Sequence, residues 1–497
     1  MTRVLPEGAL RRSTAVATAV IALVLAGCAD MGNTASQAKL RDADSLGLTT
    51  PPAAAQAGAP AAPTLDSQWW LAFGDAQLNG LIDQALAGNP TLQVARARVA
   101  HAQAAISVAQ AADKPQINGT ADLTRQKFSG NYIFPPPLGG SVQEIGDLQV
   151  TGSWEFDFFG KNRTAIESAI GSANAALADA DAARVLLASN VARGYVQWAR
   201  MQDRLTVANR TLAQREETFK LVQDRVSAGL DTRLQLKQSE TGIPQARQEI
   251  EFVKEQIEIA QHALDALVGK PNVTQGLVPP VLAGLKPMGL QQTIPADLLG
   301  RRADIAAARW RVEAATSDVA NAKTLFYPNV NLVAFVGLQS LGFDNLLKSA
   351  SQQWGVGPAI SLPIFEGGRL RANLRGKSAD LDAAIESYNA TVIDAVRDVA
   401  DQISSVQSVD RQIVQQRQAQ DAAEAAYDIA VQRYSAGLGT FLDVLTAEVA
   451  VLTQRRDGVD LAARSYDSQV ALARALGGGW QPADARTAAA EPTTQHP

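Results

Sequence analysis

Residues 89–118 read NPTLQVARARVAHAQAAISVAQAADKPQIN, and residues 300–331 read GRRADIAAARWRVEAATSDVANAKTLFYPNVN. The two stretches align so that Pro115 corresponds to Pro328. Two more pairs recur at nearly the same separation, WEFDFFGKNR (154–163) with ISLPIFEGGR (360–369) and RVSAGLDTRLQL (225–236) with RYSAGLGTFLDVL (433–445). The chain therefore contains a two-fold internal repeat with a period of roughly 210 residues. A pseudo-symmetric chain of this kind is easily arranged around a shared axis.

Each repeat contains apolar residues at every seventh position over long stretches. The first copy carries Val191, Trp198, Leu205, Leu212, Phe219 and Val226, then Leu236, Ile243, Ile250, Ile257 and Leu264; the second carries Ile385, Val392, Val399, Val406, Ile413, Tyr427 and Tyr434, then Leu438, Leu445, Leu452, Val459 and Tyr466. An apolar repeat of seven residues that continues over many turns predicts left-handed supercoiled helices. Residues 164–228 contain no proline, so a single helix of roughly 100 Å is expected there. Gly229 and Gly437 are expected to cap the reversals, and Pro244 predicts a local kink.

Four further stretches are predicted as β-strands: 117–128, 147–159, 329–340 and 353–365. The first alternates, with Asn118, Thr120, Asp122, Thr124 and Gln126 on one face and apolar or small residues on the other. Alternation over about ten residues suits a membrane barrel with a water-filled interior. A half-buried strand in a soluble sheet explains the same pattern, so the alternation alone leaves both open. Four strands are too few to close, so a barrel needs several protomers.

The amino end predicts an exported, membrane-anchored protein. Three arginines precede the apolar run 15–26, which is too short to span a bilayer and reads as part of a signal peptide over residues 1–27. It closes with LAGC, which resembles a bacterial lipobox and predicts a lipid on Cys28, the only cysteine of the chain. An ordinary signal peptide with an incidental cysteine is the alternative. Residues 28–66 are expected to form a lipid-anchored tether, and residues 477–497 a disordered tail.

The residues of an enzyme or metal site are not evident. His101, His262 and His496 are far apart and lack partners at ligand spacing. Residues 376–378 read GKS, but Arg371 stands where a phosphate-binding loop needs its first glycine. The net charge of −5 does not suggest nucleic-acid binding. We therefore expect no enzyme, no metal and no cofactor apart from the covalent lipid on Cys28.

Four stretches together resemble the TolC family: WWLAFGDAQLNGLIDQALAGNPTLQVARARVAHA (69–102), IPADLLGRRADIAAARWRVEAA (294–315), LFYPNVNL (325–332) and RYSAGLGTFLDVLTAE (433–448). With the lipobox, the chain is most similar to its NodT-type lipoproteins of resistance-nodulation-division efflux systems. The resemblance implies a mainly α fold with a transmembrane β part. Three protomers, each giving four strands, close a 12-stranded outer-membrane barrel, and long helical hairpins form a periplasmic α-barrel. The first repeat is expected over 67–275 with its hairpin at 161–268, and the second over 276–476 with its hairpin at 367–476.

The resemblance also implies a passive exit duct in the cell outer membrane. Such a homotrimer docks by its helical tips to a periplasmic adaptor protein and thereby to an inner-membrane pump. The expected tip positions are Ser227, Ala228, Gly229 and Leu230 in the first copy, and Ser435, Ala436, Gly437 and Leu438 in the second. For the periplasmic gate, Tyr434, Leu442 and Asp443 are the candidates. Thr446 and Val449 depart from the family pattern, in which an aspartate and a basic residue are common, so the gate is expected to be looser or to be built differently here.

Two other transport-related classes stay open at this point. The exit duct of a protein secretion system uses the same architecture, although the lipid anchor and the NodT-like amino-terminal segment argue against it. A periplasmic adaptor lipoprotein also carries a coiled-coil hairpin, but usually one hairpin rather than two in tandem repeat. The transported substrate is not legible in the sequence, because a duct wall need only be polar and wide.

Overall fold

The structure is a computed structural model, and it describes residues 31, 34–41, 65–290 and 298–481. The predicted signal peptide and Cys28 lie outside these residues, as do most of the predicted tether and tail. The helices are α2 (Ala76–Gly88), α3 (Pro90–Ala112), α4 (Lys161–Ser227), α5 (Arg233–Val268), α6 (Ala303–Thr324), α7 (Arg369–Ser435) and α8 (Phe441–Ala475). The strands are β1 (Gln116–Lys127), β2 (Val142–Phe156), β3 (Asn329–Leu341) and β4 (Gln352–Ser361). Short 3-10 helices cover Trp69–Phe73, Val273–Gly276, Leu282–Gly284, Leu298–Gly300, Phe343–Asn345 and Ser349–Ser351.

The chain forms two compact units, and each contains segments from both halves of the sequence. The strand unit comprises residues 100–175 and 308–388 with the described residues up to Leu40. The hairpin unit comprises the described residues of 41–99, 176–307 and 389–497. Among the described helices, none has an apolar stretch long enough to cross a bilayer.

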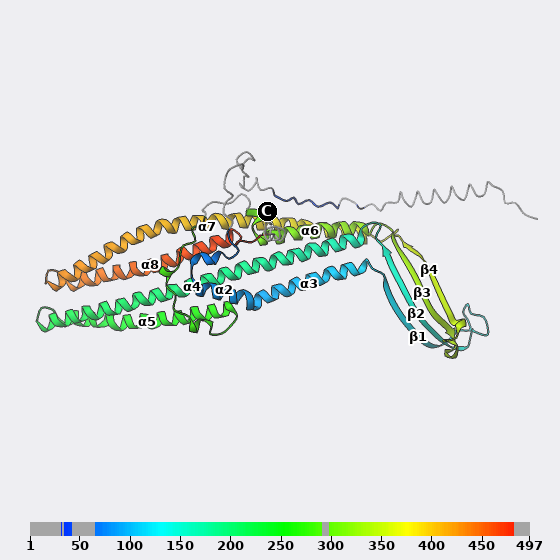
Figure 1. Ribbon diagram of the computed structural model, residues 1–497, viewed down its shortest axis with the longest axis horizontal. Coiled ribbons are helices and arrows are strands. Elements are labelled where there is room, and N and C mark those ends of the chain that lie inside the picture. The colour runs from blue at the N-terminus through cyan, green and yellow to red at the C-terminus, as the bar shows by residue number, and fades with distance from the viewer. Residues whose placement is uncertain (1–30, 32–33, 42–64, 291–297, 482–497) are drawn as a thin grey trace, which may run out of the picture. The chain divides into compact units, whose positions relative to one another are not determined.

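The strand unit contains one antiparallel sheet in the order β1-β2-β3-β4, which Figure 1 shows as four adjacent arrows. The expected hairpins are thus joined through the β2–β3 pair. β2 begins at Val142, ahead of the predicted Asp147. The reason is that its first residues continue the ladder with the end of β1, where Glu144 lies opposite Arg125 and forms an ion pair of 3.7 Å. Because Arg125 and Glu144 are both charged, a search for alternating apolar residues does not extend the predicted strand to Val142.

The two faces of this sheet differ in polarity. Val150, Val336 and Trp354 lie directly across from one another on β2, β3 and β4, and all three are exposed. The same face carries further exposed apolar side chains, namely Ile117, Leu123, Trp154, Val356 and Ile360. The opposite face carries Asn118, Thr120, Asp122, Thr124 and Gln126 of β1, and Gln339 of β3 donates to Asp147 of β2 at 3.0 Å. The alternation predicted for the first strand is confirmed. On β3 the opposite face is mixed, because it carries Val333 and Phe335 as well as Gln339.

In the strand unit, α6 and α7 pack on each other around a core of Val312, Val319, Ala322, Phe326, Leu370, Leu374, Leu381 and Ile385. α4 and α6 approach closely at Gly171, because a Cβ there would lie 3.0 Å from the backbone nitrogen of Ala314. Lys161 at the start of α4 pairs with Glu155 of β2 at 3.0 Å. Its carbonyl accepts a hydrogen bond from Asn321 of α6 at 2.6 Å. These contacts set where the first long helix leaves the sheet.

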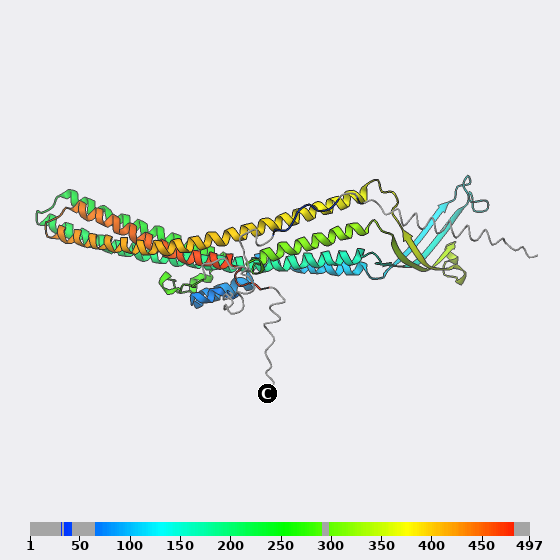
Figure 2. The ribbon, with the colours of Figure 1, turned by 90° about the horizontal axis from the view of Figure 1, so that it is seen from above.

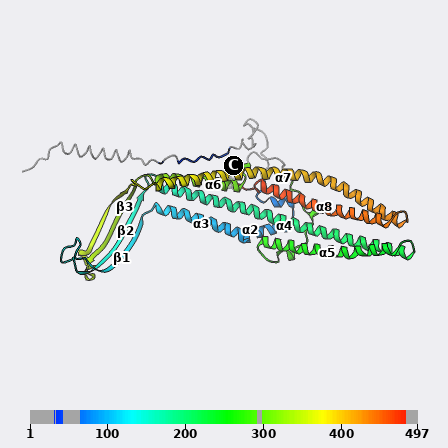
Figure 3. The same cartoon turned by 180° about the vertical axis from the view of Figure 1, so that it is seen from behind.

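In the hairpin unit, α4 pairs with α5 and α7 pairs with α8, and the four helices pack along one another (Figures 1 and 2). α4 and α7 each have 67 residues, so the expected uninterrupted helices are present. α5 continues as a helix through Pro244. The turns that join the helices of each hairpin are visible from the other side in Figure 3.

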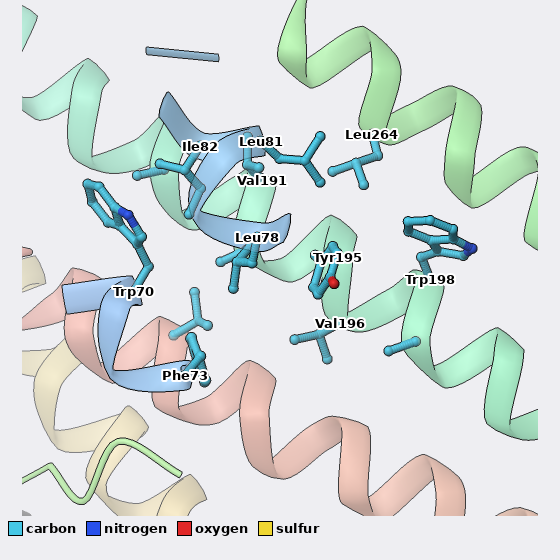
Figure 4. Close-up of a cluster of buried hydrophobic side chains, with 14 of the residues drawn as sticks. Trp70, Phe73, Leu78, Leu81, Ile82, Val191, Tyr195, Val196, Trp198 and Leu264 are labelled. Atoms are coloured by element: carbon cyan, nitrogen blue, oxygen red, sulfur yellow. The ribbon is translucent and has the colours of Figure 1, made fainter. Parts of the chain in front are cut away.

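The largest core of the hairpin unit surrounds the 3-10 helix Trp69–Phe73 and α2, which rest on α4 and α5 (Figure 4). Trp70, Phe73, Leu78, Leu81, Ile82, Val191, Tyr195, Trp198 and Leu264 are all less than 3% exposed. Asp75 caps α2 by accepting from the backbone N–H groups of Gln77 and Leu78, and it also accepts the Tyr195 hydroxyl at 2.8 Å. Burial, with Asp75 adjacent, raises the pKa of Tyr195. Asp75, the last residue of WWLAFGD, is thus the N-cap of α2 and also holds α2 against α4 through Tyr195.

Candidate functional site at the hairpin ends

Both hairpins turn at the same four-residue sequence, SAGL. α4 ends at Ser227 and Gly229 has a φ of +73°, while α7 ends at Ser435 and Gly437 has a φ of +76°. The N–H groups of Leu230 and Leu438 then bond back to the carbonyls of Arg225 and Arg433, which closes a helix end of the Schellman type. Leu230 and Leu438 are 65% and 71% exposed. The eight predicted tip residues therefore lie in the two turns, and each turn presents one exposed leucine.

Each return helix begins with a capping box. Thr232 and Gln235 form it in α5, and Thr440 and Asp443 form it in α8. The Asp443 carboxylate accepts from the Thr440 backbone N–H at 2.9 Å and from its hydroxyl at 2.8 Å. Those bonds from Thr440 hold the pKa of Asp443 below its usual range. Asp443 is thus an ionised helix cap within its own chain, and the T-x-x-Q and T-x-x-D spacings are the sequence signature for such boxes.

Three side chains join the two hairpins just above their turns, and we call Arg225, Asp231 and Tyr434 the tip cluster. Asp231 accepts a hydrogen bond from the Arg225 Nε at 2.8 Å and one from the Tyr434 hydroxyl. The Arg225 guanidinium also lies 4.6 Å from the centre of the Tyr434 ring and donates to the Ser435 carbonyl at 3.3 Å. Tyr434 is 1% exposed, and the Asp231 side chain is 9% exposed. The cluster thus links α4, the first turn and α7.

The electrostatics of the tip cluster favour one protonation state. Burial disfavours the charged Asp231, but hydrogen bonds from Arg225 and Tyr434 outweigh it and hold the pKa of Asp231 below its usual range. Burial and the adjacent Asp231 raise the pKa of Tyr434 to about 12. At neutral pH the cluster therefore contains a guanidinium, a carboxylate and a neutral phenol that donates.

Tyr434 also belongs to an apolar cluster that fixes α8 against the other helices. Its ring lies 5.6 Å from that of Phe441, and the cluster further contains Val222, Val444 and Val451. Of the other predicted gate residues, Leu442 is 70% exposed and the Asp443 side chain faces solvent beside it. The structure therefore groups Tyr434 with Arg225 and Asp231 and leaves Leu442 and Asp443 on the surface of the single chain.

The two departures from the family pattern make only local contacts. The Thr446 hydroxyl donates to the Leu442 carbonyl at 2.8 Å within α8, and Val449 is 62% exposed. Neither contacts the tip cluster in the described chain.

Sequence reasoning missed the ion pairs that lie in the seam between the hairpins. Glu448 of α8 pairs with Arg215 of α4 at 2.7 Å. Arg455 of α8 forms two hydrogen bonds with Glu424 of α7 within its own hairpin and donates to Gln214 of α4 at 2.9 Å. Closer to the large core, Asp460 accepts from both Arg200 and Arg204. The seam of α8 runs through Phe441, Val444, Glu448, Val451 and Arg455, one residue off the predicted series. Glu448 and Arg455 continue the three-and-four spacing of these buried positions, but a search for apolar residues passes over charged ones.

No group of residues within the described ranges could hold a metal ion. Within the described ranges, the hairpin ends contain hydrogen bonds, ion pairs and apolar contacts that hold the helices together.

Comparison with known proteins places this geometry in a family. The profile of the family described as outer membrane efflux protein matches residues 81–270 and 294–478. The multidrug resistance outer membrane protein MdtQ of Escherichia coli O157:H7 is 33% identical over 477 residues, which cover 94% of this chain and 98% of MdtQ. The fusaric acid resistance protein FusA of Burkholderia cepacia is 39% identical over 377 residues, 75% of this chain and 70% of FusA.

Among solved structures, the outer membrane protein VceC from Vibrio cholerae superposes with a TM-score of 0.78 at 36% identity, covering 84% of this chain and all of VceC. The expected resemblance and the mainly helical fold with a four-stranded sheet per chain are thereby confirmed. The chain belongs to the outer membrane efflux protein family.

Proposed function

We propose that the protein is the outer-membrane exit duct of a tripartite efflux pump, which passively conducts drugs or other small molecules to the exterior. The observation that carries this proposal is the sheet with an exposed apolar face and a polar opposite face, in a chain whose relatives are outer-membrane efflux proteins. An exposed apolar face suits contact with lipid, and the polar face suits a water-filled lumen.

The duct forms from three copies of the chain. Within the described chain, β1 and β4 each pair along only one edge. An unpaired edge is unfavourable in a bilayer, so the edges of one sheet pair with those of the next copy. Three sheets of four strands close a 12-stranded barrel, and the long hairpins of the three copies form the periplasmic conduit.

The hairpin ends are the docking and gating region. Their two exposed leucines, Leu230 and Leu438, offer apolar contacts to a periplasmic adaptor, which links the duct to an inner-membrane pump. The tip cluster holds the two hairpins of each copy together and so keeps the end narrow. Leu442 and Asp443 stay free to face the same residues of the other copies, where three carboxylates repel one another and attract cations.

A lipid on Cys28 anchors the protein to the outer membrane. Residues that follow Cys28 support this, because they are bound to the strand unit: Met31 and Ala38 pack against its core. The Asp382 carboxylate of α7 accepts the Ser36 hydroxyl at 2.5 Å and the backbone N–H groups of Gln37 and Ala38 at 2.9 Å each. These bonds from Ser36 and the backbone hold the pKa of Asp382 below its usual range. An ionised Asp382 thus fixes the segment behind the anchor.

Replacing Asp382 with alanine is expected to release this segment to proteases. Lys39 is a trypsin site directly after the residues that lose three hydrogen bonds, whereas the Arg41 N–H stays bonded to Asn389 Oδ1 at 3.0 Å. We expect cleavage at least severalfold faster in Asp382→Ala, measured by mass spectrometry of the released peptide. Asp380→Ala is the matched control, since Asp380 is 70% exposed and only faces Lys377 at 3.8 Å. Equal cleavage in the two variants would argue against the clamp.

Charge on the apolar face of the sheet is expected to block membrane insertion. Val150 and Gln149 are neighbours in β2 and point to opposite faces. Val150→Arg places a cation toward lipid, at a cost of about 2–4 kcal/mol near the midplane. Gln149→Arg places the same cation toward the lumen and is expected to be nearly neutral. The measurement is the fraction of protein that resists urea extraction from outer membranes, and the proposal predicts a large loss for Val150→Arg alone.

A deletion strain separates efflux from protein secretion. Removal of the gene is expected to raise sensitivity to a panel of small amphiphilic drugs and to leave the set of secreted proteins unchanged. The intact gene supplied in trans should restore resistance. Loss of one or more secreted proteins with unchanged drug sensitivity would favour the secretion duct instead.

A further inference from the structure

A cavity of about 250 Å³ lies within the hairpin unit, between α4, α5 and α8. Its charged lining residues are Arg204 and Arg215 of α4, Glu249 of α5 and Arg456 of α8, and its inner wall includes Ala208 and Ala246. Both alanines are buried. The volume corresponds to roughly eight water molecules at about 30 Å³ each, or to one tetrahedral oxyanion with a few waters.

Small residues on α5 make room for the arginine at one end of this cavity. The Arg215 Nη1 donates to the Gly242 carbonyl at 2.9 Å, and a Cβ on Gly242 would lie 3.2 Å from the Arg215 Cδ. Arg215 also donates from Nε to Glu448 of α8 at 2.7 Å, and its side chain is 19% exposed. The guanidinium is therefore held in one place by α5 and α8 before any ligand arrives.

Positive charge exceeds negative charge around the cavity. Arg204 pairs with Asp460, which Arg200 shares; Arg215 pairs with Glu448; and Arg456 faces Glu249 at 3.1 Å. Arg200, Asp460 and Glu448 lie outside the lining, so the wall of the cavity itself carries three guanidiniums, those of Arg204, Arg215 and Arg456, and one carboxylate, that of Glu249. A partly enclosed site whose wall carries more guanidiniums than carboxylates attracts a small anion, because the low local dielectric strengthens the interaction.

The arginines also retain donors. Arg204 uses Nε and Nη2 for Asp460, and Arg215 uses Nε and Nη1, so that Nη1 of Arg204 and Nη2 of Arg215 have no acceptor among the described residues. Arg456 is 46% exposed and makes an ion pair without a recorded hydrogen bond. Guanidinium groups on several sides of a tetrahedral oxyanion are a common way to bind it, because their planar donors match its oxygens.

We propose that this cavity binds a small inorganic oxyanion of the size of sulfate or phosphate. The bound ion contacts Arg204 and Arg215 on α4 and Arg456 on α8, so its occupancy strengthens the packing of one hairpin on the other. The site is small and recessed, which favours a free ion over a larger ligand. This inference goes beyond the proposed duct function, and it is tested by binding to the isolated protein without any transport.

The test is isothermal titration of sodium sulfate into the full-length protein in detergent, with gluconate as the only other anion. The native protein is expected to bind sulfate saturably. Arg456→Gln removes one cation from the cavity and should weaken binding about tenfold, as the loss of one charge-assisted contact does. Glu249→Gln removes the competing carboxylate and should tighten binding. Two neutralisations of the same exposed ion pair thus have opposite expected effects.

Arg247→Gln is the control variant, because Arg247 lies on α5 like Glu249, pairs with Glu216 at 3.2 Å and does not line the cavity. It should bind sulfate like the native protein. Sulfate stabilises most proteins without specific binding, and such an effect would be the same in all four proteins. Absence of saturable binding, or equal affinities for the Arg456 and Glu249 variants, would overturn the proposal.

Discussion

Cells that carry Asp231→Ala are expected to take up a bulky hydrophilic dye that the intact outer membrane excludes. In the native chain Asp231 accepts bonds from both Arg225 and Tyr434, so its removal leaves a covered guanidinium without its counterion and frees the Tyr434 hydroxyl. The loss is expected to be about 1–3 kcal/mol, since solvent at the hairpin ends screens part of it. We expect at least a severalfold rise in dye uptake as the hairpins separate.

Asp224→Ala is the matched control for this experiment. Asp224 lies one residue before Arg225, its side chain makes no recorded contact among the described residues, and it is exposed. Its removal changes the charge by the same amount without touching the tip cluster. If both variants admitted dye equally, general loss of negative charge would explain the leak and the cluster would not be part of the gate.

The tip cluster is expected to be insensitive to pH near neutrality. The pKa of Asp231 is lowered in the folded chain, so the contribution of its carboxylate is complete above the usual carboxyl pKa and is lost only as pH falls through the lowered value. Dye exclusion by the native protein should therefore be unchanged from neutral pH down to about pH 5.

Trp198→Ala is expected to produce the largest loss of stability. Trp198 is fully buried in the core of the hairpin unit, and its ring lies 6.0 Å from that of Tyr195 in an edge-on arrangement. Removing so large a buried side chain leaves a cavity and costs about 3–5 kcal/mol. The measurement is the urea midpoint in detergent, followed by circular dichroism of the helices.

Two variants make this test specific to packing. The Trp198 Nε1 has no hydrogen-bond partner among the described residues, so Trp198→Phe loses only ring volume and should cost clearly less than the alanine variant. Phe252→Ala removes an aromatic ring that is 50% exposed on α5 and should be nearly neutral. A Trp198→Phe loss as large as that of Trp198→Ala would mean that the indole nitrogen, and not packing, holds this position.

The long helices and the sheet were predictable because each depends on a simple periodicity. The recurrence of apolar residues at every seventh position predicted α4 and α7, and the alternation of polar and apolar residues in β1 predicted the two faces of the sheet. Leu438 shows the limit of the same rule: it was predicted as the first residue of the seven-residue series of the return helix, yet it is exposed, because it lies in the turn before α8 begins at Phe441. A seven-residue apolar repeat does not show where a helix begins or ends.

The contacts between the hairpins were less predictable because they join residues far apart in sequence. Tyr434 was singled out, but its partners Arg225 and Asp231 come from the other repeat, and no local pattern connects them. Asp443 was singled out as a gate carboxylate, and the structure adds a capping role that the sequence analysis did not predict. The gate assignment itself stays a prediction.

Single-channel conductance of the purified full-length protein in planar bilayers tests the duct most directly. We predict stepwise, cation-selective channels of small conductance from the proposed trimer, because the tip clusters are proposed to keep the hairpin ends narrow and the proposed ring of Asp443 carboxylates attracts cations. Protein that is inserted in the bilayer as a trimer and yet never conducts, in the native form or as Asp231→Ala, would contradict the proposal that this chain forms a gated exit duct.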